Sequence, residues 1–299
     1  MTPLSFLRGL LAARLAPDAL RWLEATMEEI GRGAPVESFC ALFSLAARHA
    51  RRVPLAPGAD ERGAAARLVE GWNPERWNLL EAARVALILV RSDLAGDGGV
   101  RALGEAFRYA DEGELCALLR SLALLPGAER FAWRAGEGCR SNMRSVFEAA
   151  ALDTPYPARH FDDLAWRQCV IKCLFVGAPL WRLWGLDERM SPELARMALD
   201  LADERRSAGR PVPHELWLCL GRHGAARGLA ALELELASGN PNLAGRCGAV
   251  LALARAGEKR RLEQLDANES HPAVRAALAR ARAGETRATA FQHLETVRA

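Results

Sequence analysis

The chain lacks any long hydrophobic run. Its longest uninterrupted apolar segments, such as 85–90, are six residues long, whereas a helix that crosses a bilayer needs about 20. The apolar stretch near the N-terminus is broken by arginines and is followed by no small-residue cleavage site, so it predicts an amphipathic first helix. The sequence therefore predicts a protein that does not span a membrane, and we expect it in the cytoplasm.

A dominant charge sign is missing too, and lysine is scarce. The formal net charge is +3, and only two of the 40 basic residues are lysines, Lys172 and Lys259. No basic cluster is interleaved with aromatic residues, so nucleic acid is not an expected partner. With 299 residues, 50% of them hydrophobic and 26% charged, the chain has the composition of a globular protein of one or two domains.

Cysteine motifs are absent. The seven cysteines contain no CxxC pair, and an odd, dispersed set argues against a disulfide framework and for a reducing compartment. Cys169 with Cys173, and Cys219 with His223, have the i,i+4 spacing of half a metal site. Because no second pair lies nearby at ligand spacing, we predict buried thiols and no metal.

The common enzyme templates are also absent. There is no Gly-rich phosphate loop, no nucleophile elbow, no HExxH and no Ser/His/Asp order. His160, beside Asp162 and Asp163, lies in a predicted turn, where a capping role is favoured over acid–base chemistry. The sequence implies no cofactor and favours a non-catalytic protein, while an enzyme stays open.

What the chain does contain is helical periodicity. Apolar residues recur every three or four positions over 20–30, 39–50, 79–90, 113–125, 139–150, 164–176 and 194–202. Gly and Pro punctuate the chain at 31–35, 54–63, 95–99, 126–127, 155–157 and 209–211. A capping hydroxyl, a proline and an acid mark a helix start at Ser191, Pro192 and Glu193. No alternating strand pattern is found, so the predicted fold class is all-α.

The C-terminal third repeats a short pattern. Segments 239–257 and 269–284 each have a proline near a helix start and the ending Arg-Ala-Gly, and the two endings lie 27 residues apart. This period suits HEAT-like helical hairpins that stack into a right-handed superhelix, or solenoid. We expect one helical domain over 1–220, degenerate repeats over 221–299 that continue the same solenoid, and a frayed helix after Gly284.

Residues 134–217 differ from the rest because polar side chains interrupt apolar helical patterns. On a helix over 139–150, a solvated face with i,i+4 pairs is predicted for Glu137, Arg140, Arg144 and Glu148. Asn142 falls at the edge of the apolar stripe, where a buried amide needs a protein or ligand partner.

A narrow polar line also marks the helix predicted over 164–176. Apolar residues cover nearly its whole circumference, as in a buried helix, and Gln168 and Lys172 lie four residues apart on one line. A lysine in that place snorkels, pairs with a carboxylate, faces a ligand anion or acts in catalysis. Structural pairing is favoured first, ligand contact second and catalysis last.

Arg205 continues the apolar stripe of the helix that follows Ser191. Together with Arg134 or Arg140 it would suit a carboxylate or phosphate. Asp187 and Arg189, in the turn before that helix, are expected to lock the loop. The candidate ligand-binding residues are therefore Arg134, Glu137, Arg140, Asn142, Gln168, Lys172 and Arg205.

Several segments carry unusual motifs: FCALFSLAARHARR (39–52), GWNPERW (71–77), EAARVALIL (81–89), YADEGELCALLRSLALLPG (109–127) and, within 134–217, RAGEGCRSNM, PYPARHFDDLAW, PLWRLWGLDERM, DERR, AGRPV and ELW. Together they resemble the EboA family of bacterial metabolite-traffic proteins, over about 180 residues with gaps. Arg167 stands where the family has asparagine, and Asp203 and Arg206 stand where histidine and tryptophan are usual.

The resemblance implies a place in a pathway and no particular reaction. Such proteins are encoded beside a membrane prenyltransferase, so the implied partners are a small-molecule precursor of secondary metabolism and proteins of the same gene cluster. No catalytic residues carry over from the family. An enzyme that processes an isoprenoid or aromatic precursor, with Lys172, Glu137 or His160 transferring protons, stays open, as does a scaffold that uses a concave C-terminal surface.

Overall fold

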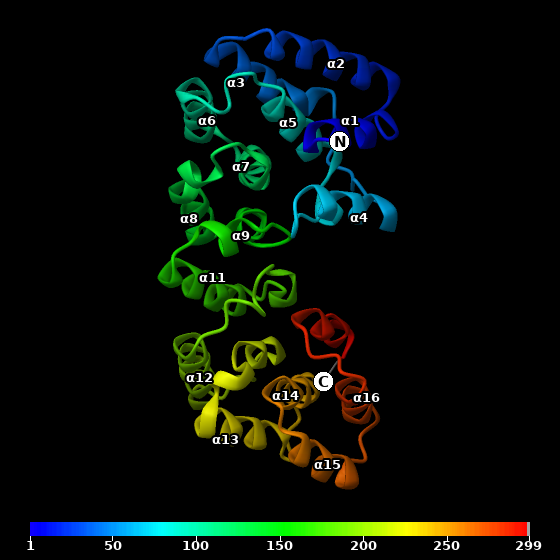
Figure 1. Cartoon of the computed structure of the whole chain (residues 1–299), viewed down its shortest axis with the longest axis vertical. Coiled ribbons are helices and arrows are strands. Elements are labelled where there is room, and N and C mark those ends of the chain that lie inside the picture. Colours follow the sequence, from blue (N-terminus) through cyan, green and yellow to red (C-terminus); the bar gives the residue numbers. More distant parts are fainter. Residues whose placement is uncertain (298–299) are drawn as a thin grey trace. The chain divides into compact units, whose positions relative to one another are not determined.

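The computed structural model describes residues 1–297, and over that range it contains helices and loops with no strand, which confirms the all-α prediction (Figure 1). An isolated bridge joins Pro54 and Asn78. The chain divides into two compact units, Met1–Ala165 and Trp166–Ala299. Within residues 1–297, no helix combines the length and the apolar character that crossing a membrane would require.

Unit 1 contains ten complete helices among its described residues: α1 (Pro3–Ala12), α2 (Pro17–Gly31), α3 (Val36–Leu45), α4 (Ala59–Leu68), α5 (Leu79–Leu89), α6 (Asp97–Tyr109), α7 (Glu112–Ser121), α8 (Ala132–Arg140), α9 (Arg144–Ala151) and α10 (Tyr156–His160). Short 3-10 segments between them are η1 (Ala46–Arg48), η2 (Pro74–Arg76), η3 (Leu122–Leu124) and η4 (Ala128–Phe131). The helices predicted over 20–30 and 79–90 correspond to α2 and α5.

Helix α5 forms the centre of unit 1. All its residues from Leu79 to Ile88 are buried, because α1, α2 and α7 pack around it. Asn78 fixes the start of the helix, since its side chain accepts the Glu81 N–H while the Glu81 carboxylate accepts the Asn78 N–H, both at 2.9 Å. The core of unit 1 therefore includes charged side chains of α5, and these require partners on neighbouring helices.

The single helix predicted over 139–150 is wrong. Helix α8 ends at Arg140 and α9 begins at Arg144, with an extended link between them. In that link the Ser141 hydroxyl accepts the Met143 N–H at 3.1 Å, a local bond with which serine competes against helix formation. The apolar stripe on which Asn142 was placed is therefore interrupted.

Unit 2 receives most of α11 (Asp163–Val176), which begins at the end of unit 1. Its other helices are α12 (Pro192–Ser207), α13 (Ala225–Leu236), α14 (Leu243–Ala256), α15 (Lys259–Asn268) and α16 (Pro272–Arg282), with 3-10 segments η5 (Leu180–Arg182), η6 (His214–Cys219), η7 (Gly221–His223) and η8 (Ala288–Thr296). The predicted start of α12 is confirmed, because the Ser191 hydroxyl accepts the Leu194 N–H at 3.1 Å and Pro192 opens the helix.

Helix α14 forms the centre of unit 2, where α13, α16 and η6 pack against it (Figure 1). Its residues from Gly245 to Leu253 are all buried. The two Arg-Ala-Gly endings both close helices, since Gly257 after α14 and Gly284 after α16 have φ of +81°, a conformation that favours glycine. The arrangement as a right-handed HEAT-like superhelix, and the division at residue 220, stay predictions.

The chain after Gly284 is packed, so the predicted frayed helix is wrong over 288–296. The η8 segment buries Ala288, Ala290, Phe291 and Leu294. The Asp187 carboxylate also accepts the Ala288 N–H at 3.2 Å. Apolar side chains three apart give the segment a face to bury, which a polar tail would lack. Residues 298–299 lie outside the described residues.

Candidate functional site

The charged residues predicted to share one solvated helix face are divided between α8 and α9, and most of them are exposed. Arg140 donates to the Glu137 carboxylate at 2.7 Å, and Arg144 donates to the Glu148 carboxylate at 2.7 Å. Glu137, Arg140 and Arg144 are exposed. Exposed pairs of this kind contribute at most about 1 kcal/mol. Ligand contact by Glu137 and Arg140 stays a prediction.

Two of the predicted buried polar positions are corrected by the structure. Asn142 is exposed in the link between α8 and α9, because the helix breaks there. Gln168 is also exposed, because α11 is not buried all around: Leu164 and Phe175 are 57% and 65% exposed. Lys172 on the same helix is half-buried. A ligand role for Lys172 stays a prediction.

The polar residues around α12 hold loops of unit 2 in place. Arg205 is half-buried and its Nε donates to the Pro211 carbonyl at 2.7 Å. The Asp187 carboxylate pairs with the Arg255 guanidinium at 2.7 Å. The loop-locking role predicted for Asp187 is thereby confirmed.

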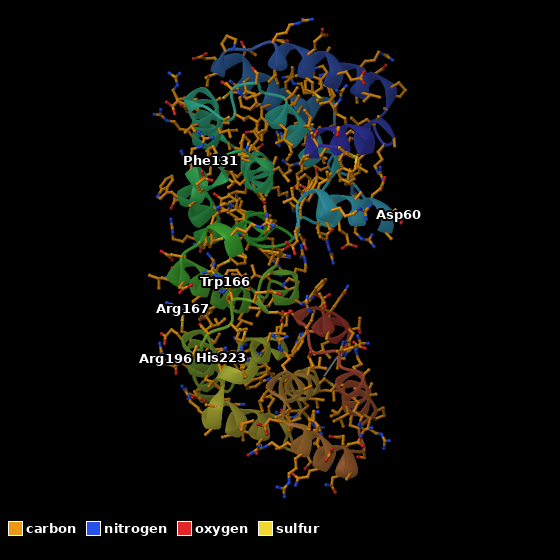
Figure 2. All side chains as sticks on the ribbon, viewed as in Figure 1. Asp60, Phe131, Trp166, Arg167, Arg196 and His223 are labelled. Atoms are coloured by element: carbon orange, nitrogen blue, oxygen red, sulfur yellow. The ribbon has the colours of Figure 1, made fainter. Side chains whose placement is uncertain are left out.

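Arg189 is anchored by Trp166 of α11, which Figure 2 labels. The Trp166 indole donates to the Arg189 carbonyl at 3.2 Å, and the Arg189 guanidinium lies 4.9 Å from the ring centroid. The turn before Ser191 is thus tied to α11 by a hydrogen bond and a cation–π contact, which confirms the loop-locking role predicted for Arg189.

A buried polar cluster in unit 2 escaped the sequence reasoning. Glu235 of α13 is 2% exposed, and its carboxylate accepts from Arg206 at 3.2 Å and from the Asn242 amide at 2.7 Å. Asn242 also donates to the Val212 carbonyl at 2.8 Å. Gly245 allows this approach, since a Cβ there would lie 2.0 Å from the Glu235 carboxylate. These hydrogen bonds connect α12, α13 and the start of α14, so the cluster stabilises the packing of unit 2.

Acid–base groups also gather around η6. The Glu215 carboxylate accepts the N–H groups of Leu180 and Trp181 at 3.0 and 3.2 Å. Burial raises the pKa of Glu215 to about 7, although these two N–H donors act in the opposite direction. The neighbouring His214 has a lowered pKa, again because of burial. With both Glu215 oxygens bonded to the backbone, the group holds η5 in place.

Arg134, another candidate, lines an open groove in unit 1. The groove has a volume of about 920 Å³ and lies between α3, α6 and α8, lined by Val36, Glu37, Arg101, Gly104, Glu105, Phe107, Arg108 and Arg134. The Arg134 guanidinium lies 5.2 Å from the Phe107 ring centroid and 4.8 Å from that of Trp133. Two aromatic rings therefore hold the guanidinium at the groove wall.

The groove combines positive charge with apolar surface. Three arginines and two carboxylates line it, and the backbone of α6 leaves open space at Gly104. Tyr109 and Trp133, next in sequence to Arg108 and Arg134, are 72% and 61% exposed. Such surroundings suit an anionic group attached to an apolar or aromatic body. Of the seven candidate residues, only Arg134 lines this groove.

Comparison with known proteins identifies the family. A family model described as metabolite traffic protein EboA matches residues 4–221, most of the 299-residue chain. The chain belongs to the EboA family. No curated protein and no solved structure matches the chain.

The EboA match ends at residue 221, inside unit 2. Residues after 221 nevertheless form ion pairs with residues of the matched region. Asp187 pairs with Arg255, and Arg206 pairs with Glu235. Both arginine–carboxylate pairs thus join the matched region to the C-terminal helices of the same unit. Unit 2 of this EboA-family protein therefore needs its C-terminal segment for its own packing.

The cysteines supply neither disulfides nor a metal site over residues 1–297. Six of them are buried and Cys40 is half-buried. Burial raises the pKa of Cys219 to about 12 and those of Cys116 and Cys247 to about 11. A thiol is nucleophilic only as its thiolate, so these three behave as the buried, inert thiols that were predicted.

Proposed function

We propose that this EboA-family protein is a carrier that holds a small anionic metabolite in the groove of unit 1 and hands it to a partner. The observation that carries the proposal is the placement of Arg134, in cation–π contact with Phe107 and Trp133 at the wall of the groove. The family's description as a metabolite-traffic protein supports a traffic role.

The charges of the groove define the kind of ligand. Arg101, Arg108 and Arg134 offer guanidinium donors that match a carboxylate, and Glu37 and Glu105 leave a net positive charge. Phe107 supplies an aromatic wall for an apolar body. Because the groove is open, the ligand can enter and leave without unfolding a helix, as transfer to a partner requires.

The proposal also names a class of ligand, the partner proteins and the location in the cell. We propose a precursor of secondary metabolism as the ligand, proteins of the same gene cluster, including a membrane prenyltransferase, as partners, and the cytoplasm as the location. Gln168, Lys172 and Arg205 are proposed as contacts for a ligand or partner protein on unit 2 by itself. A HEAT-like solenoid over 1–220 and 221–299 would offer such partners an extended surface.

The alternative function, an enzyme, is tested by whether the purified protein converts a substrate. If the chain processes an isoprenoid or aromatic precursor, purified protein must convert it, and Lys172, Glu137 or His160 must be needed for the reaction. Burial lowers the pKa of His160, which also lies 4.6 Å from the Tyr156 ring, so its neutral form would act as the base.

Calorimetric titration with two carboxylate probes, 4-hydroxybenzoate and geranate, tests the carrier proposal. The variant Arg134→Met keeps the length of the side chain but removes the charge and its hydrogen bonds, so it should weaken binding about tenfold or more. The matched control Arg21→Met removes an exposed arginine of α2 outside the groove and should bind as the wild type does.

Equal affinities of the Arg134→Met and wild-type proteins would contradict the proposal. So would the absence of binding of both probes to the natively folded wild-type chain at millimolar concentration.

A further inference from the structure

A buried arginine in unit 1 keeps one donor group without a protein partner. The Arg84 side chain is 1% exposed; its Nε donates to the Phe43 carbonyl at 3.2 Å and its Nη2 to the Glu114 carboxylate at 3.1 Å. Its Nη1 has no hydrogen-bond partner among the described residues. A buried guanidinium N–H left without an acceptor is costly, so an acceptor is expected there.

A second guanidinium lies beside that donor. Gly113, in the first turn of α7, separates the two: a Cβ at Gly113 would lie 2.6 Å from Arg52 Nη2 and 3.5 Å from Arg84 Nη1. The positive charge of Arg52 contributes to the lowered pKa of Arg84, after the larger effect of burial. Two guanidinium groups this close together offer the kind of donors that suit an oxyanion.

The start of α7 adds to this positive potential. The N–H groups of Glu112 and Gly113 open the helix and have no carbonyl acceptor within it. The carboxylates nearby already accept hydrogen bonds: Asp111 from the Glu114 N–H, Glu114 from Arg84, and Glu112 from the Ser145 hydroxyl. The Glu114 carboxylate pairs with Arg84 itself, while Arg84 Nη1, the Arg52 guanidinium and the helix start supply the donors that an anion could use.

Arg52 also lines an open cavity of about 580 Å³. The cavity wall includes Pro57, Arg62, Glu75, Arg76 and Trp77. Two backbone hydrogen bonds of 2.9 Å, from Leu55 to Trp77 and from Leu79 to Val53, hold the two segments of this wall together. The cavity shares Arg52 with the two-guanidinium cluster, and Pro57, Trp77 and two further arginines line its wall.

We propose that Arg52, Arg84 and the start of α7 bind the phosphate group of an organic phosphate whose apolar body lies in the cavity beside Trp77. A phosphate fits better than a carboxylate because three sets of donors converge on it, and a phosphate presents more acceptor oxygens than a carboxylate. This site is separate from the Arg134 groove and does not depend on the carrier proposal.

Gly113→Ala is the sharpest variant for this site, because it removes no charge. The new methyl group would displace the Arg52 guanidinium, the mobile end of a flexible side chain, from its place beside Arg84. Alanine also favours the helix over glycine, so the variant should unfold at the same or a higher temperature. Gly9→Ala in α1, where a Cβ meets nothing within 4 Å, is the matched control.

The experiment is a calorimetric titration of the full chain with phenyl phosphate, with inorganic phosphate and with benzoate. We expect phenyl phosphate to bind the wild type more tightly than the other two probes, and to bind Gly113→Ala about tenfold more weakly. Gly9→Ala should match the wild type. Gly104→Leu, which places a bulky side chain in the Arg134 groove, should leave phenyl phosphate binding unchanged.

Three results would overturn the proposal. The first is unchanged phenyl phosphate affinity in Gly113→Ala. The second is an affinity of the Gly104→Leu chain, whose Arg134 groove is blocked, for inorganic phosphate or benzoate equal to its affinity for phenyl phosphate, which would exclude an organic phosphate as the ligand. The third is no phenyl phosphate binding by the folded wild type at millimolar concentration.

Discussion

At the scale of single residues, burial moves neighbouring titratable groups in opposite directions. Glu215 and His214 are adjacent in η6, and loss of water raises the pKa of the carboxyl to about 7 and lowers that of the imidazole. In each case burial favours the neutral form. Both groups therefore make the stability of unit 2 depend on pH near neutrality.

The sign of the Glu215 effect follows from its raised pKa. Its ordinary pKa is 4.5 and its folded value about 7, so its contribution is fully present below pH 4.5 and is lost as the pH rises through 7. Compared with Glu215→Gln, the wild type should lose about 2 kcal/mol of unfolding free energy between pH 5 and pH 8. Urea denaturation of both proteins at each pH measures this.

His214 makes the opposite contribution. Because its pKa is lowered from 6.5, its stabilisation is present above that pH and is lost as the pH falls. His214 is present in both proteins, so its effect cancels in the difference between the wild type and Glu215→Gln. If the difference in unfolding free energy between the wild type and Glu215→Gln stays constant from pH 5 to pH 8, the pKa of Glu215 is not raised by folding.

At the scale of elements, short local signals predicted helix starts better than helix ends. Ser191 and Pro192 predicted the first turn of α12, because a cap depends only on neighbouring residues. The break between α8 and α9 was missed, because the apolar spacing of 139–150 continues across Ser141. The packing of η8 was missed too, because it depends on distant partners such as Asp187.

The packing of η8 predicts a large effect of Phe291. This side chain is fully buried, so Phe291→Ala should lower the unfolding free energy by about 3–5 kcal/mol. Phe175→Ala is the matched control, since that ring is 65% exposed and its loss should cost less than about 1 kcal/mol. Similar urea midpoints for the two variants would show that the C-terminal segment is not part of the core.

At the scale of the whole molecule, the sequence predicted the fold class and the family but little of the site. Helical periodicity is a property of each segment and needs no tertiary contact, so the all-α class could be read directly. The groove could not be predicted from the sequence, because Val36, Arg101 and Arg134 come from three helices whose packing brings them together. The buried Glu235 and Arg84 were missed for the same reason, since their partners are remote in sequence.

The central claim is that the groove of unit 1 holds a metabolite. Native mass spectrometry of the chain isolated from its own cells tests it most directly, with Gly104→Leu as the blocking variant and Gly9→Leu as its control. Both glycines lie on helices with open space at the Cβ position, but only Gly104 lines the groove. We predict an anionic small molecule bound to the wild type and to Gly9→Leu and lost from Gly104→Leu. No bound molecule on the wild type, or retention by Gly104→Leu of every molecule that the wild type binds, would contradict the account.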